Sequence, residues 1–215
     1  MATGVLAVWT DVDPAAEAEF DDWYNRQHLP ERVAVPGFRS GQRYRCLGDG
    51  PRYLAWYETD GPDALRSAAY RARLDGPTPW TRKIMPAFRD TVRSVFVAPV
   101  RFGAGRGGYA ATVRPVRAAE PLAVAEAGLA RLIDLPGVIG VQWWRLADFA
   151  GEAADTAETA MRGRDRVAPE AVLIEATDPE PLDRACAALA IEPQAAQVDR
   201  YRLLYALAHA EAEGG

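Results

Sequence analysis

The sequence predicts an α+β fold in which two tandem ferredoxin-like β-α-β-β-α-β units pack sheet against sheet as an intramolecular α/β barrel. Three observations lead to this prediction: an internal repeat, the same order of expected elements in each half, and strands that are apolar on both faces. The repeat places LPGV at 135–138 and QWWR at 142–145, each 100 positions after VPGF at 35–38 and QRYR at 42–45. Later, AVLIE at 171–175 follows LAWYE at 54–58 by 117 positions, which indicates a duplication with an insertion between residues 146 and 169.

Local signals define the elements of the first half. Asp13 followed by Pro14 is typical of a helix N-cap with proline in the first turn, and we expect this helix to end near His28, where Leu29 and Pro30 break it. Apolar, β-prone runs bounded by turn residues predict the strands. The strands expected here are 5–12, 38–47, 52–59 and 93–102, and the second helix covers 62–74.

The second half repeats this order of elements. Its expected strands are 109–115, 138–146, 171–176 and 198–207, and its helices are 122–135 and 181–189. The glycine-rich segment 103–108 is interpreted as a linker without a side-chain anchor. We therefore divide the chain into residues 1–103, which carry the candidate site, and a degenerate half at 104–215.

The strands predict how the halves pack. Leu54 and Trp56 form one alternating set of a strand, and Tyr53, Ala55 and Tyr57 form the other. Because both sets are apolar or aromatic, each sheet must be covered on both faces. Packing of the two sheets against each other covers the faces that the helices leave bare.

The composition is typical of a globular cytoplasmic protein. The 215 residues are 49% hydrophobic and 26% charged, with a formal net charge of −5. No stretch approaches the roughly 20 apolar residues of a membrane span, and the N-terminus lacks the basic region of a secretory signal. Cys46 and Cys186 are far apart and fit a reducing compartment.

The same composition limits partners and cofactors. An acidic chain without a basic run is not expected to bind nucleic acid. Two histidines without HxH or HExxH spacing do not predict a metal site, and the 103–108 glycines lack the context of a dinucleotide site, so no cofactor is expected. A homodimer through helices or strand edges remains open.

The first helix carries the candidate chemistry. Phe20, Trp23, Tyr24, Gln27 and His28 form one stripe at helical spacing. A partly buried imidazole stays neutral and can act as a base near pH 7, and Tyr24, one turn away, could orient it or donate to an oxyanion. The structural alternative is a histidine that caps the helix C-terminus or satisfies a buried carbonyl.

These residues resemble a known family. WYNRQHLPE at 23–31, VPGF at 35–38, Arg43-Tyr44 and PRYL at 51–54 are similar to the EthD-like branch of the dimeric α/β-barrel superfamily, over about residues 5–97. The resemblance implies a cavity between sheet and helices for a small, often aromatic molecule, and it favours His28 as a site residue. It does not specify a reaction, because the superfamily includes polyketide cyclases, cofactor-free monooxygenases, isomerases, decarboxylases and haem enzymes.

The second half lacks the polar pair. Positions 100 residues after Tyr24 and His28 are Val124 and Gly128. We therefore expect one functional pocket, in the first half, with the second half in the place of a dimer partner.

Other side chains are weaker candidates. Aromatic residues that could line the pocket are alternatively core, and Arg43 or Arg82 could bind a carboxylate or could be solvated. The substrate-binding candidates are Trp9, Trp23, Tyr44, Tyr70, Trp80 and Arg43.

The leading functional hypothesis is a cofactor-independent enzyme, of the lyase, cyclase, isomerase or oxygenase type, with His28 as general base or acid and Tyr24 beside it. Its substrate would be small and hydrophobic, aromatic or polyketide-like. The first alternative is a non-catalytic protein that binds a hydrophobic metabolite or associates with itself. The second is a haem enzyme, although the second half offers only His209 as an axial ligand.

Overall fold

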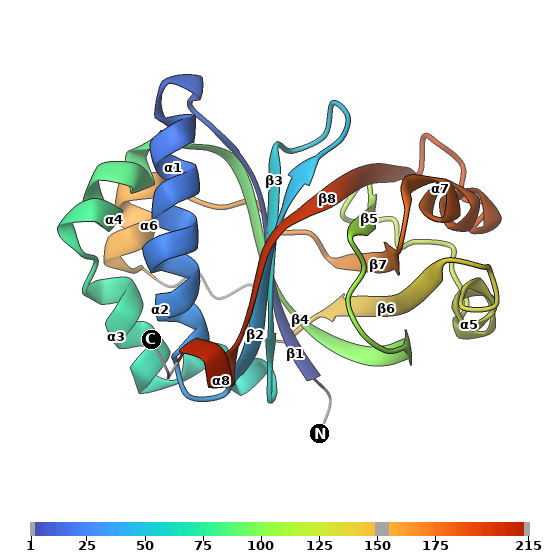
Figure 1. Ribbon diagram of the computed structural model, residues 1–215, viewed down its shortest axis with the longest axis horizontal. Coiled ribbons are helices and arrows are strands. Elements are labelled where there is room, and N and C mark those ends of the chain that lie inside the picture. Colours follow the sequence, from blue (N-terminus) through green and yellow to red (C-terminus); the bar gives the residue numbers. More distant parts are fainter. Residues whose placement is uncertain (1–2, 149–154, 213–215) are drawn as a thin grey trace.

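The computed structural model describes residues 3–148 and 155–212. Its strands form one closed antiparallel barrel in the order β1-β3-β2-β8-β5-β7-β6-β4 (Figure 1). The strands are β1 (Thr3–Val12), β2 (Phe38–Cys46), β3 (Tyr53–Thr59), β4 (Phe88–Gly103), β5 (Tyr109–Pro115), β6 (Val138–Leu146), β7 (Glu170–Ala176) and β8 (Ala196–Ala208).

Each half has the ferredoxin-like strand order. β4-β1-β3-β2 forms the first half and β8-β5-β7-β6 forms the second. The halves join edge to edge, where β2 pairs with β8 and β4 pairs with β6. The predicted fold class, two ferredoxin-like units closed into a barrel within one chain, is therefore confirmed.

The helices form two layers on opposite sides of the barrel. In Figure 1, α1, α2, α3, α4 and α6 cover one side, and α5 and α7 cover the other. The helices are α1 (Glu17–Trp23), α2 (Leu29–Val33), α3 (Ala68–Asp75), α4 (Pro79–Ile84), α5 (Glu126–Leu132), α6 (Ala157–Arg162), α7 (Pro179–Ala188) and α8 (His209–Ala212). Within the described ranges, every helix is too short to cross a bilayer.

The two apolar faces of each strand have different neighbours, as predicted. Leu54 and Trp56 lie inside the barrel, whereas Tyr53 and Tyr57 face the first helical layer. Aromatic rings occupy much of the barrel interior, and they are Trp9, Tyr44, Trp56, Phe96, Trp144 and Tyr201. The barrel is thus a packed core and not a channel.

The first helix is longer than predicted. It does not end at His28, because a π-helical turn over Tyr24–His28 leads directly into α2. The N–H of Leu29 donates to the carbonyl of Tyr24, five residues back, and Pro30 falls in the first turn of α2, where its missing N–H is tolerated. The expected helix break at Leu29-Pro30 is therefore wrong.

Other boundaries also differ from the predictions. The helix expected at 62–74 is divided into a 3-10 turn (Pro62–Arg66) and α3, because Ser67 caps a new helix by accepting from the N–H of Tyr70. β4 begins at Phe88, five residues early, and the helix expected at 122–135 is limited to α5. The segment before β4 forms α4, which was not predicted.

The segment between the halves has a side-chain anchor, contrary to the prediction. Arg106 donates to Glu58 at 2.8 Å and to the hydroxyl of Ser40 at 3.2 Å. Its guanidinium lies 4.6 Å from the ring centroid of Trp56, inside the barrel. Arg106 therefore fixes the connection between β4 and β5 to the barrel wall.

The insertion of the second half contributes to the first helical layer. α6 lies beside α3 and the 3-10 turn Met85–Ala87, although roughly 70 to 90 residues separate them in sequence (Figure 1). The helical layer of the first half is thus completed by a helix from the second half.

Candidate functional site

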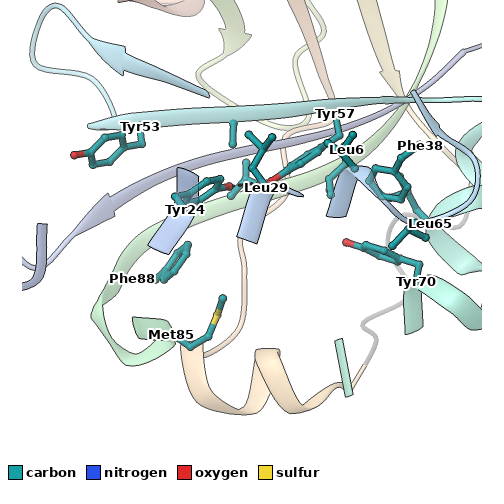
Figure 2. Close-up of a cluster of buried hydrophobic side chains, with 14 of the residues drawn as sticks. Leu6, Tyr24, Leu29, Phe38, Tyr53, Tyr57, Leu65, Tyr70, Met85 and Phe88 are labelled. Atoms are coloured by element: carbon teal, nitrogen blue, oxygen red, sulfur yellow. Dashed lines mark hydrogen bonds between the residues drawn. The ribbon is translucent and has the colours of Figure 1, made fainter. Parts of the chain in front are cut away.

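A cavity of about 950 Å³ lies between the first half of the barrel and its helical layer. Leu6, Val8 and Tyr57 of β1 and β3 contribute to its sheet side. Figure 2 shows Met85 and Phe88 across from Leu65 and Tyr70, with the hydroxyl of Tyr70 directed toward the space between them. The volume is within the range of pockets that hold small molecules.

His28 lines this cavity from the π-helical turn. Its side chain packs between aromatic rings, with centroid distances of 4.3 Å to Trp23 and 4.8 Å to Tyr24. Only 8% of the residue is exposed. A π-helical turn adds a residue to the helix and changes which side chains face inward, and such turns occur frequently at functional sites.

The imidazole is neutral and lacks an intramolecular partner at Nδ1. Burial lowers the pKa of His28 well below 6.5, and the nearby positive charges of Arg32 and Arg162 lower it further. In the part of the chain that the structure describes, Nδ1 has no hydrogen-bond partner. His28 therefore neither caps a helix end nor satisfies a buried carbonyl through this nitrogen, which were the structural alternatives.

The hydroxyl of Tyr24 can donate a hydrogen bond to a ligand. Its hydroxyl accepts a hydrogen bond from Tyr57 at 3.3 Å, which leaves its own proton for another acceptor. Burial raises the pKa of Tyr24, so the hydroxyl is protonated at neutral pH. The cavity thus combines a neutral imidazole and a phenolic donor.

A buried ion pair connects the two halves at the cavity wall. Arg32 of α2 donates to Glu158 of α6, and the two residues are 3% and 4% exposed. Nη1 of Arg32 has no partner among the described residues. Next to this pair, Arg162 binds Asp165 through two hydrogen bonds at 2.9 and 2.5 Å. The pair between Arg32 and Glu158 holds α6 against the first helical layer.

The structure brings together some of the predicted site residues. Tyr24, His28 and Tyr70 line the cavity, and Trp23 supports the face of His28 without lining it. Tyr70 accepts a hydrogen bond from Arg93 at 3.0 Å.

Other predicted residues lie elsewhere. Trp9 and Tyr44 are in the barrel interior, and Trp80 packs on the helix-side core outside the cavity lining. Arg43 is 1% exposed, binds Asp21 and Asn25, and lies 4.8 Å from the Tyr24 ring centroid, so it is neither solvated nor part of the lining. Trp9, Tyr44, Trp80 and Arg43 are therefore separate from this cavity.

Most of the lining was not recognised in the sequence, and three charged residues show why. Arg32 follows His28 by four residues and would have been found on the same stripe if the helix had been extended past Pro30. Arg93 lies in the strand expected at 93–102, but the sequence does not indicate which face of the sheet its side chain occupies. Glu158 gives no local signal, because its partner is 126 residues away.

The buried neutral histidine predicts a pH-dependent stability. The unfolded chain binds the proton near pH 6.5, whereas folded His28 binds it only at a much lower pH. The free energy of unfolding should therefore fall as the pH drops below 6.5, by up to about 1.4 kcal/mol per unit from this residue. Urea unfolding at about pH 7.5 and 5.5 should show a smaller fall for His28→Gln than for the wild type. Equal falls for the wild type and His28→Gln would contradict a neutral His28.

No group of three or more His, Cys, Asp or Glu side chains in residues 3–148 and 155–212 could hold a metal ion.

In the second half, side chains fill the space between the sheet and the helices. Leu129, Ile174 and Leu182 are fully buried there. The ring nitrogen Nδ1 of His209 lies 2.6 Å from the carbonyl of Val33, on the first half of the molecule.

The fold is that of a duplicated dimeric α/β-barrel protein. No family model and no curated protein matches the sequence. An anthrone oxidase-like protein has a similar structure, with a TM-score of 0.64 at 13% identity, over 98% of this chain and 94% of that one. A proposed monooxygenase from Fusobacterium nucleatum has a TM-score of 0.61 at 8% identity, over 96% and 94%. A haem-binding protein from Thermus thermophilus has a TM-score of 0.52 at 11% identity, over 99% and 94%.

These similarities show the fold over nearly the full chain, and not the EthD-like branch. Haem suits the described residues of this chain poorly. A histidine that ligates a metal usually donates its other ring N–H to a carboxylate or carbonyl, and the Nδ1 of His28 has no such partner. The filled space of the second half contains no described histidine. No step of a mechanism is therefore assigned to haem.

Proposed function

We propose that the protein is a cofactor-independent enzyme that acts by general acid/base chemistry on a small hydrophobic, aromatic or polyketide-like substrate. The observation that carries this proposal is the neutral imidazole of His28 in a cavity of about 950 Å³, where its Nδ1 has no hydrogen-bond partner among the described residues. The similarity to an anthrone oxidase-like structure supports an aromatic substrate, since anthrone is a fused-ring aromatic ketone.

His28 and Tyr24 have different roles in this proposed reaction. A ring nitrogen of His28 takes a proton from a phenol or from a carbon next to a carbonyl group. The electron pair left on that carbon moves to the carbonyl oxygen, where the O–H of Tyr24 stabilises the enolate. The proton returns from His28 at a later step. The enolate carbon can attack a second carbonyl group to close a ring, can be protonated at another position to isomerise, can expel a β-hydroxyl group that takes the proton from His28 and leaves as water, or can react with molecular oxygen. Decarboxylation of a 3-keto acid would form the same enolate, which Tyr24 would stabilise and His28 in its protonated form would protonate.

The buried surroundings suit this chemistry. With its pKa lowered, His28 is in the base form throughout the neutral range. Because Arg32 and Arg162 lie near the imidazole, their positive charges stabilise a negatively charged enolate, and the enolate supplies the counter-charge for the imidazolium that forms with it. A His28 that pointed away to a backbone carbonyl would favour the non-catalytic alternative. Its Nδ1 has no partner among the described residues, which supports the enzyme.

Proton removal can be tested without knowing the product. Aromatic ketones, including anthrone, and aromatic 1,3-diketones are incubated with the protein in D₂O without haem or added metal, and NMR follows both binding and exchange of the acidic C–H. We expect at least one bound compound to exchange faster than it does without protein. Binding without accelerated exchange for every bound compound would support the binding-protein alternative. Catalysis only after haem is added would support the haem alternative.

A further inference from the structure

The charged residues of the cavity have an excess of positive charge. Its lining contains six arginines, which are Arg32, Arg66, Arg71, Arg93, Arg162 and Arg164. It contains three carboxylates, which are Asp155, Glu158 and Asp165. Among the lining residues that the structure describes, the formal charge is therefore about +3 with His28 neutral, in a protein whose net charge is −5. The positive charge thus distinguishes this site from the chain as a whole.

The carboxylates do not neutralise all of the interior arginines. Glu158 binds Arg32, and Asp165 binds Arg162. Arg93 donates to the Tyr70 hydroxyl at 3.0 Å, and in the part of the chain that the structure describes it makes no ion pair within 4.0 Å. Arg93 is on β4 directly opposite Val8 of β1, and both residues line the cavity. A guanidinium held by a tyrosine on one side has further N–H groups for a planar anion.

The exposed part of the lining also carries arginine side chains. Among the described residues of the lining, Arg71 and Arg164 are exposed, together with one acidic residue, Asp155. Another part of the lining is buried and apolar or aromatic, with Leu6, Val8, Met85 and Phe88 among its residues. A lining with mostly positive charges on one side and an apolar wall on the other fits a ligand with an aromatic ring system and an anionic group.

We infer that the cavity selects an aromatic carboxylate, whose carboxylate group binds Arg93 while its ring lies against the apolar wall near His28. This inference rests on the proposed function for the site, and it adds the charge of the substrate. A carboxylate accepts two parallel N–H bonds from a guanidinium, which also fixes the orientation of the ring. Arg93 is then a binding residue that determines specificity and does not take part in proton transfer.

Two ligands of nearly equal shape test the charge selection. The dissociation constants of 2-naphthoate and 2-naphthamide are measured by calorimetry at low ionic strength. We expect the carboxylate to bind at least about tenfold more tightly, because a hydrogen-bonded charge contributes more than a neutral amide. Equal affinities, tighter binding of the amide, or no measurable binding of the carboxylate would overturn the inference.

Variants test whether Arg93 causes the preference for the carboxylate over the amide. Arg93→Gln should reduce carboxylate affinity at least about tenfold and leave amide affinity unchanged. Arg93→Lys should retain part of the preference, because lysine keeps the positive charge but lacks the two parallel N–H groups of the guanidinium. Arg82→Gln, an exposed arginine outside the lining, is the matched control and should keep the full preference. If Arg93→Gln weakens both ligands equally, or neither, Arg93 is not the anion site. Circular dichroism confirms that each variant is folded, and Arg93→Lys carries the test if Arg93→Gln is not.

The two proposals fail in different ways. If His28 is not a base but the cavity selects carboxylates, the naphthoate preference persists although no exchange occurs in D₂O. If His28 is a base but the cavity is indifferent to charge, neutral ketones exchange and the naphthoate preference is absent.

Discussion

The His28→Gln variant is expected to lose about 10²–10⁴-fold in turnover, the usual contribution of a general base. Glutamine has a similar size and a polar end, but its amide cannot accept a proton at neutral pH. Its side chain can still pack between Trp23 and Tyr24, whose rings lie 4.3 and 4.8 Å from the imidazole centroid. The measurement is kcat on the substrate found by the exchange experiment, with circular dichroism to verify the fold.

His209 provides the matched control, because it is the second of two histidines in the chain. It lies in α8 and does not line the cavity. His209→Gln should therefore keep the wild-type kcat. If His28→Gln also keeps it, the imidazole does not move the proton.

The second large effect concerns stability. Glu158→Gln should lower the free energy of unfolding by about 3–5 kcal/mol, because it removes one partner of a buried ion pair and leaves the charge of Arg32 without compensation. The loss is measured by urea unfolding. The double replacement Arg32→Met and Glu158→Met removes both charges and should recover much of that stability.

An exposed ion pair gives the comparison. Glu180 and Arg184 on α7 are 85% and 44% exposed, at helical spacing i,i+4. Glu180→Gln should cost at most about 1 kcal/mol, as exposed pairs contribute little. If Glu158→Gln costs no more than Glu180→Gln, the pair between α2 and α6 does not hold the cavity wall together.

The fold could be predicted because duplication leaves marks that do not depend on side-chain contacts. Both Pro-Gly turns, 100 residues apart, place their glycine at positive φ, +89° for Gly37 and +88° for Gly137. Glycine adopts this conformation without strain, so the turn motif persisted in both halves. The strands that are apolar on both faces then required the sheets to pack on each other.

The end of the first helix could not be predicted from proline alone. Pro30 breaks an ordinary α-helix, but the π-helical turn before it shifts the hydrogen bonds by one residue. The same error hid Arg32, which belongs to the continued helix.

The candidate site was predicted only in part, for two physical reasons. Adjacent residues of a strand face opposite sides, so Val8 lines the cavity while Trp9 lies in the barrel, and the sequence does not say which face is which. The wall from α6 depends on a contact between residues 126 positions apart, for which no local pattern exists. His28 and Tyr24 were identified because their helical stripe is local.

The most direct test of the account is a crystal structure of the protein with a bound aromatic ketone that carries a carboxylate. We predict that the ligand lies in the cavity between β1, β3, β4 and the first helical layer, with its acidic C–H or phenol at a ring nitrogen of His28 and its carboxylate at Arg93. A ligand bound at any other place, or in the cavity with its reactive group turned away from His28, would contradict the account.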